Sequence, residues 1–167
     1  MSIFSRRLEV TPAELVYRLS EIHSMLSLTV RRAVEATVNR DSSVGDSMYQ
    51  VMQYKTDGLV AFAVEFTIRN TLKPQEASVI VSDMYMLSAY DKSHYVQRFQ
   101  DIPSEMGRVS HARFEYLMAG MAFQECCGTT GNTDADNLVK QFGANAFANV
   151  FDLISKELKQ VKLIRVS

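Results

Sequence analysis

The sequence predicts a single α+β domain over residues 1–167, with a long N-terminal helix, an antiparallel meander of three or four strands, and two C-terminal helices. Three observations lead to this fold class. Apolar residues recur at helical spacing near the start of the chain and again near its end. Between these regions, residues 60–68 alternate between large apolar side chains and smaller or polar ones, as in a strand with one buried face.

The first element is a helix that begins after Thr11 and can extend to Asn39. Threonine is a common N-cap, Pro12 suits the first helical position, and Glu14 completes the spacing of a capping box. Its apolar stripe consists of Leu15, Leu19, Ile22, Leu26, Val30 and Ala33. A stripe of this length needs a partner of similar length, which is either the C-terminal helix of the same chain or a helix of another subunit.

The middle of the chain is expected to form the sheet. Residues 40–47 are rich in turn formers, and three extended segments follow at residues 47–54, 60–68 and 77–90. Asp57-Gly58 favours a hairpin turn between the first two segments. Residues 91–101 are compatible with a fourth strand or with a short helix, and both remain open.

Two helices are expected in the C-terminal part, from Ser104 to about Cys127 and from Thr133 or Asp134 towards Val161. Both contain small residues on their apolar side, which allow two helix axes to approach closely. These residues are Ala119, Gly120, Gly143, Ala144 and Ala148. The two helices are therefore expected to pack against each other at these positions.

The connection between these helices, residues 121–137, contains adjacent cysteines and a glycine-rich loop. Cys126 and Cys127 lie at a helix end, where the helix dipole disfavours a thiolate, so buried structural thiols are favoured over a redox or catalytic role. The loop lacks the lysine of a phosphate-binding P-loop, and Asp134 and Asp136 would repel an anion. It is interpreted as a helix end at Gly128, a turn and an N-cap.

Histidines offer little support for catalysis or metal binding. His111 and Glu115 are four residues apart, a spacing that fits a metal edge or an acid–base pair but more often a surface hydrogen bond. His111 and Cys126 are 15 residues apart on the same expected helix, which separates them by about 22 Å. His23 lies at the border of the first apolar stripe. No catalytic residue, metal ligand or cofactor is assigned, and the protein is expected not to be an enzyme.

A partner-binding surface is expected in residues 85–99, where aromatic and basic side chains alternate, together with two arginines of the first helix. The assigned residues are Tyr85, Tyr90, Lys92, His94, Tyr95, Arg98, Phe99, Arg31 and Arg32. Such a composition is typical of a protein interface or of a surface that binds single-stranded nucleic acid, and it also occurs where the core simply meets the surface.

The leading hypothesis is a non-catalytic interaction or assembly protein that self-associates through its long helices and sheet, with itself or another protein as partner. Nine methionines suit adaptable contacts. The alternative is a nucleic-acid-binding protein, although the net charge of −1 gives it no strong positive field. A small cysteine- or histidine-dependent enzyme is the third hypothesis.

The N-terminus lacks the apolar run of a signal peptide and no stretch is long enough for a membrane span. A cytoplasmic location is expected, or the host-cell cytoplasm if the protein is viral, without a membrane partner.

Overall fold

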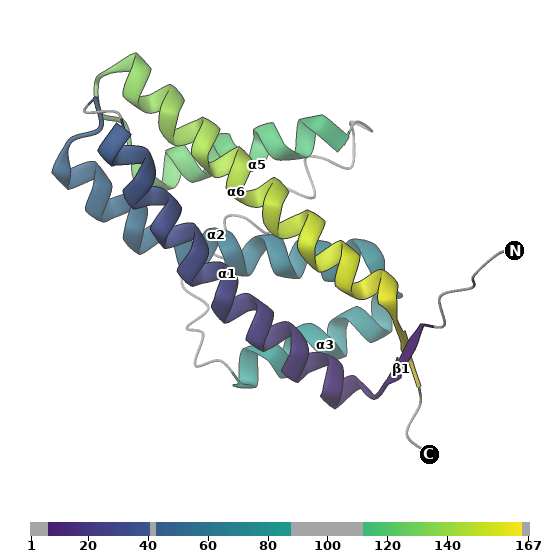
Figure 1. Ribbon diagram of the computed structural model, residues 1–167. Coiled ribbons are helices and arrows are strands. Elements are labelled where there is room, and N and C mark those ends of the chain that lie inside the picture. Colours follow the sequence, from purple (N-terminus) through teal and green to yellow (C-terminus); the bar gives the residue numbers. More distant parts are fainter. Residues whose placement is uncertain (1–6, 41–42, 88–111, 165–167) are drawn as a thin grey trace, which may run out of the picture.

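The computed structural model describes residues 7–40, 43–87 and 112–164, and within them the chain is almost entirely helical (Figure 1). Its described part contains five helices and two short strands. In chain order these are β1 (Leu8–Val10), α1 (Pro12–Arg40), α2 (Asp46–Thr71), α3 (Pro74–Leu87), α5 (Ala112–Cys127), α6 (Thr133–Gln160) and β2 (Val161–Leu163). The strands pair in parallel, with Leu8 opposite Val161.

The predicted α+β meander is wrong. Residues 47–54 and 60–68, expected as two strands of a hairpin, both belong to α2, and the expected turn at Asp57-Gly58 lies inside this helix. Residues 77–87 of the third expected strand belong to α3, while residues 88–101 lie outside the described residues. The two strands that the described residues do form are parallel and lie at the ends of the chain.

The reason for this error is the central position of α2, which contacts α1, α3, α5 and α6. Every residue from Leu59 to Ile68 is buried, so this part of the helix is covered on all sides. A helix that is buried all round has no polar face and therefore no helical period in its sequence. Thr67, expected on the polar side of a strand, is instead buried with its hydroxyl donating to the carbonyl oxygen of Ala63 at 2.6 Å.

Helix α1 follows its prediction closely. It begins at Pro12 and ends at Arg40, one residue beyond the expected limit. The capping box is formed, since the backbone N–H of Thr11 donates to Glu14 Oε2 at 2.7 Å. In return, the backbone N–H of Glu14 donates to Thr11 Oγ1 at 3.2 Å. These bonds satisfy donors that the first turn of a helix leaves unpaired.

Helices α5 and α6 approach closely at the predicted glycines. A methyl group at Gly120 would lie 2.4 Å from the carbonyl oxygen of Lys140, and one at Gly143 would lie 2.7 Å from Cβ of Phe123. Neither position has space for a side chain, so glycine is required by packing. The end of α5 at Cys127 and the start of α6 at Thr133 are as predicted, whereas residues 104–111 of the expected helix lie outside the described residues.

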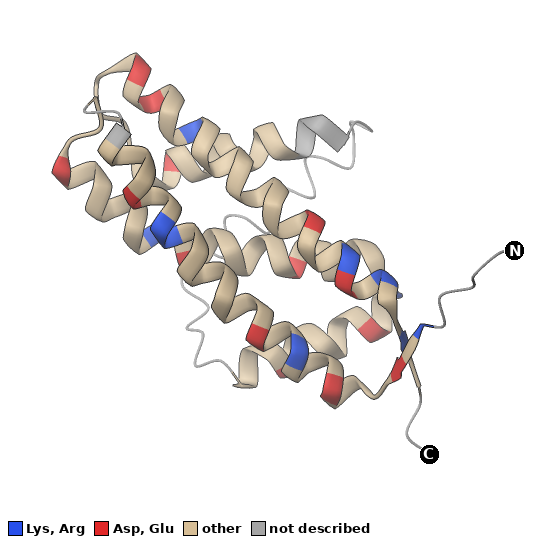
Figure 2. Cartoon of the chain, in the orientation of Figure 1, with Lys and Arg blue, Asp and Glu red and all other residues tan. Residues whose placement is uncertain are grey.

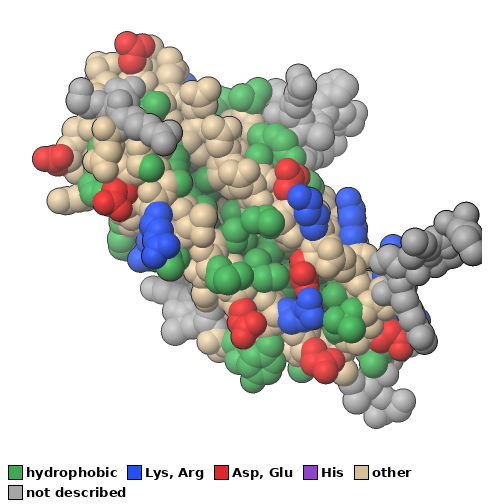
Figure 3. Space-filling view, in the orientation of Figure 1, with side chains coloured by type: hydrophobic (Ala, Val, Ile, Leu, Met, Phe, Trp, Pro, Cys, Tyr) green, Lys and Arg blue, Asp and Glu red, His purple; other side chains and the backbone are tan. Residues whose placement is uncertain are grey.

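The expectation that the first and last helices cover each other is only partly correct. Helix α1 packs mainly against α2 and α3, and α6 packs mainly against α5 and α2. Direct links between α1 and α6 include an ion pair between Arg18 and Glu157, while β1 and β2 join the neighbouring chain ends. Figure 3 shows hydrophobic side chains in the strip between these two helices. The long stripes therefore bury themselves chiefly on α2 rather than on one another.

Acidic and basic residues are scattered along the described helices, without a long segment of one sign (Figure 2). This agrees with the net charge of −1. Among the described helices, none combines the length and the apolar character needed to cross a bilayer.

Candidate functional site

A cleft of about 430 Å³ opens between α1, α2 and α3. Its apolar wall is formed by Leu28, Ala61, Val64, Ile68, Val81, Met84 and Leu87. Its polar lining is formed by Ser20, His23, Ser24, Ser27, Arg31, Asp57, Glu65 and Tyr85. Eight of the fifteen lining residues are polar, yet apolar atoms make up most of the accessible lining, and a mainly apolar lining is typical of small-molecule sites.

Glu65 is the buried carboxylate of this cleft, with 6% of the residue exposed. Arg69 Nε donates to its Oε1 at 2.7 Å from one turn further along α2. The hydroxyl of Tyr85 on α3 donates to its Oε2. A buried carboxylate is costly unless it is paired and hydrogen-bonded, and these two donors meet that need while joining α2 to α3.

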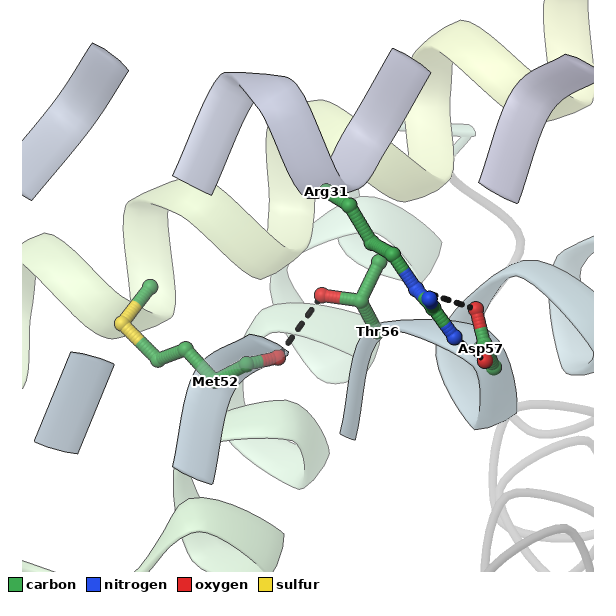
Figure 4. A network of polar contacts seen from close by, with 4 residues as sticks. All are labelled: Arg31, Met52, Thr56 and Asp57. Atoms are coloured by element: carbon green, nitrogen blue, oxygen red, sulfur yellow. Dashed lines mark hydrogen bonds and ion pairs between the residues drawn. The ribbon is translucent and has the colours of Figure 1, made fainter. Parts of the chain in front are cut away.

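Arg31 and Asp57 form an ion pair between α1 and α2 at the same cleft (Figure 4). Arg31 Nε donates to Asp57 Oδ1 at 3.1 Å, and the second guanidinium bond goes to Oδ2. The carbonyl oxygen of Arg31 also accepts a bond from Gln53 Nε2 at 2.8 Å. In the same view, the buried Thr56 hydroxyl donates to the carbonyl oxygen of Met52 at 2.7 Å, one turn earlier in α2, which satisfies this hydroxyl within the helix.

His23 lines the cleft from α1 and is buried, with 8% of the residue exposed. Burial lowers its pKa to about 4, although the negative charge of Asp57 acts in the opposite direction. The imidazole is therefore uncharged at neutral pH, since burial disfavours the charged form.

The predicted partner-binding residues are divided by the structure. Arg31 and Tyr85 both line the cleft, where Asp57 and Glu65 respectively accept their hydrogen bonds. Arg32 is exposed on α1 and is not among the cleft residues. The remaining six residues lie outside the described residues: Tyr90, Lys92, His94, Tyr95, Arg98 and Phe99. Of the three described residues of this set, two line the same cleft, and both already bond within the chain.

Sequence reasoning missed Glu65 and Asp57 as members of a site because it assigned them to a strand and to a turn. The signal that could have found Glu65 is its spacing from Arg69, which is four residues and typical of an ion pair on a helix. His23, expected at the border of the α1 stripe, is instead buried, and nothing in its neighbours along the chain indicates the cleft.

The cysteines and the loop after them match their structural interpretation in several details. Burial raises the pKa of Cys127 to about 12, and Cys126 is half-buried. Gly128 has the positive φ of +86° typical of a helix end. Asn132 is the N-cap of α6, and its side chain accepts from the N–H of Asp134 at 2.9 Å. Asp136 Oδ1 accepts from the Thr130 N–H at 2.8 Å, so this carboxylate serves the loop itself.

The other predicted pair, His111 and Glu115, cannot be placed because neither side chain is described. Among the described residues, no three or more histidine, cysteine, aspartate or glutamate side chains converge as metal ligands would.

A second concave surface is the groove on the outer side of α5 and α6, called here the α5–α6 groove. It is lined by Tyr116, Leu117, Met118, Met121, Asn137, Lys140, Gln141, Ala144, Asn145 and Ala148. Leu117 and Met121 are one turn apart on α5 and are 61% and 47% exposed. Ala144 and Ala148 are one turn apart on α6 and half-buried. The groove therefore has a projecting apolar edge beside a strip of small side chains.

Comparison of the chain with protein-family models, curated proteins and solved structures found no match. The function is therefore inferred from the cleft and the α5–α6 groove themselves.

Proposed function

We propose that this protein is a non-catalytic interaction protein that self-associates through the α5–α6 groove. The observation that carries the proposal is the exposure of Leu117 and Met121 side by side on α5. Scattered apolar side chains are normal on a protein surface, whereas neighbouring large ones in a concave surface favour a binding site.

The shape of the groove supports a second copy of the chain as the partner. In a dimer with two-fold symmetry, a patch contacts the same patch of its partner, so it must be complementary to itself. Leu117 and Met121 form the projecting side of the groove, and Ala144 and Ala148 form the low side. Two such grooves facing each other allow the projecting side of each copy to pack over the alanines of the other.

The border of the groove suits such an interface as well. Asn137, Gln141 and Asn145 contribute uncharged amide groups, and Lys140 is the charged residue among the described lining residues. An apolar centre with a polar border and few charges is the usual composition of a protein–protein interface. Each amide carries both donors and an acceptor, so it can pair with the equivalent groups of a second copy.

The test is the concentration dependence of the molar mass, measured by sedimentation equilibrium on the full chain and on two leucine variants. Leu117→Glu places a charge in the centre of the proposed interface and should weaken dimerisation about 100-fold or more. Leu153→Glu is the matched control, because Leu153 is 49% exposed on α6 but is not a groove residue. It should dimerise like the unchanged protein.

Two results would overturn the proposal. One is a native chain that stays monomeric at millimolar concentration. The other is a dimer that Leu153→Glu weakens as much as Leu117→Glu, because the interface would then involve a different surface. The compartment we propose is the cytoplasm, where a reducing environment suits the thiols of Cys126 and Cys127, which form no disulfide.

A further inference from the structure

The cleft between α1, α2 and α3 has the size of a small-molecule site. Its volume of about 430 Å³ lies within the range of roughly 300–1,000 Å³ typical of ligand pockets. An apolar cavity of roughly 150 Å³ is sufficient for one benzene molecule. The cleft therefore has room for a body of roughly three aromatic rings, or for an aliphatic body of similar size.

The charges around the cleft are already paired within the chain. Arg31 bonds to Asp57, and Arg69 bonds to Glu65. The carboxylate of Glu65 also accepts from Tyr85. A charged ligand would have to lose its hydration and compete with these pairs, which is costly in a mostly apolar site. An anion would in addition face two carboxylates, so the electrostatics favour an uncharged ligand.

The polar side of the cleft offers hydrogen-bond acceptors, besides the hydroxyl groups of Ser20 and Ser27, which have no partner among the described residues and can accept or donate. The hydroxyl of Ser24 donates to the carbonyl oxygen of Ser20 at 3.0 Å, which leaves its oxygen lone pairs as acceptors. A carboxylate has about four lone-pair sites, and the described bonds to Asp57 come from Arg31. A ligand hydroxyl or N–H group would thus find acceptors along this wall.

From these observations we propose that the cleft binds a small, uncharged molecule with an apolar body of roughly three rings' volume and a hydroxyl or N–H donor. The apolar body contacts Leu28, Met84 and Leu87, which line the cleft from α1 and α3. The donor bonds to the acceptors of Ser24 or Asp57. This site lies on a different set of helices from the α5–α6 groove, so it does not depend on self-association.

The test uses two fluorescent probes that differ by a single charged group. N-phenylnaphthylamine is uncharged, has three rings and carries one N–H donor, whereas anilinonaphthalene sulfonate adds a sulfonate. The uncharged probe should bind at one saturable site, at least about tenfold more tightly than the sulfonate. Equal or tighter binding of the sulfonate would overturn the proposal, and so would fluorescence that rises without saturation.

The position of the probe can be read from the methionine methyl signals in NMR spectra. Met84 lines the cleft, and Met121 lines the α5–α6 groove. The uncharged probe should shift the signal of Met84 and leave that of Met121 unchanged. A shift of Met121 alone, or of neither signal, would overturn the assignment to this cleft.

Matched leucine variants complete the test without disturbing the core. Leu28 and Leu153 are 52% and 49% exposed, but Leu28 lines the cleft. Leu28→Glu should weaken binding of N-phenylnaphthylamine at least about tenfold, while Leu153→Glu should leave it unchanged. Equal effects of both variants would contradict the proposal. Leu117→Glu, which addresses self-association, should bind the probe like the unchanged chain, so the two proposals can fail separately.

Discussion

Arg18 on α1 and Glu157 on α6 form a hydrogen-bonded ion pair across 139 residues of sequence, with Arg18 Nε donating to Glu157 Oε1 at 2.8 Å. A second bond runs from the same guanidinium to the same carboxylate oxygen. The Glu157 side chain is largely covered, whereas the Arg18 side chain is half-exposed. This pair is a direct polar link between the first and last helices of the bundle.

We expect the Arg18–Glu157 pair to contribute a coupling energy of about 0.5–1 kcal/mol to the free energy of unfolding. A double-mutant cycle with Arg18→Ala and Glu157→Ala, followed by urea unfolding, measures it. The control cycle uses Lys162 and Glu9, whose side chains are both more than half exposed. Its coupling should be close to zero because solvent screens exposed charges. A stronger coupling in the control pair would contradict this view.

Gly120→Ala should lower the free energy of unfolding by about 1–3 kcal/mol, because the new methyl group would collide with the backbone oxygen of Lys140. This loss outweighs the gain in helix propensity, which is about 1 kcal/mol. Gly45→Ala is the control, since nothing lies within 4 Å of its added methyl group and it should change stability by only about 0.5 kcal/mol. Thermal unfolding of both variants checks the difference. Equal stability of the two would show that α5 and α6 can separate without cost.

His23 makes stability depend on pH. Its pKa is about 4 in the folded chain and 6.5 without the fold, so the unfolded chain binds more protons between these values. The stability gained from the neutral imidazole is complete above pH 6.5 and is lost as the pH falls towards 4. Between pH 7 and pH 5 the loss should be about 2 kcal/mol.

The measurement is urea unfolding of the native protein and of His23→Gln at several pH values. The variant should lose clearly less stability than the native protein over this interval, because glutamine does not titrate. The carboxylates titrate in both proteins, so the difference between the two profiles isolates the contribution of His23. Parallel pH profiles would mean that the folded chain binds a proton at His23 as readily as the unfolded one.

Cys127 should resist alkylation in the folded protein. Burial raises its pKa to about 12, and the reaction requires the thiolate, so its rate at pH 8 should fall about 1,000-fold below that of the unfolded chain. Cys126→Ser leaves Cys127 as the single thiol, and mass spectrometry after treatment with iodoacetamide follows the reaction with and without urea. Rapid labelling of the folded variant would place Cys127 in contact with solvent.

The sequence alone was sufficient for elements whose signals are local. Thr11, Pro12 and Glu14 marked the start of α1, and Gly128 marked the end of α5. The glycines of α5 and α6 predict a close helix contact from the sequence alone, and the structure contains it. Each of these features depends on residues within a few positions of each other, or on a residue type with one main structural use.

The central helix could not be recognised in this way. Val60, Phe62, Val64, Phe66 and Ile68 alternate as they would in a strand, but their burial results from four surrounding helices. The same reason hid the cleft, because the neighbourhood of Glu65 and Tyr85 exists only after α2 and α3 have formed and packed. The burial of α2 and the position of the cleft both depend on contacts between distant segments, so no local sequence pattern indicates them.

The parallel pairing of β1 and β2 has a mechanical consequence. Leu8 lies opposite Val161, and Val10 lies opposite Leu163, so both strands run in the same direction. When the chain is pulled at its two ends, one strand is drawn backwards and the other forwards along their common axis. This geometry loads the inter-strand hydrogen bonds together in shear instead of opening them one by one like a zipper. A tensile force would thus meet its first resistance at this small clamp before the helices begin to unravel.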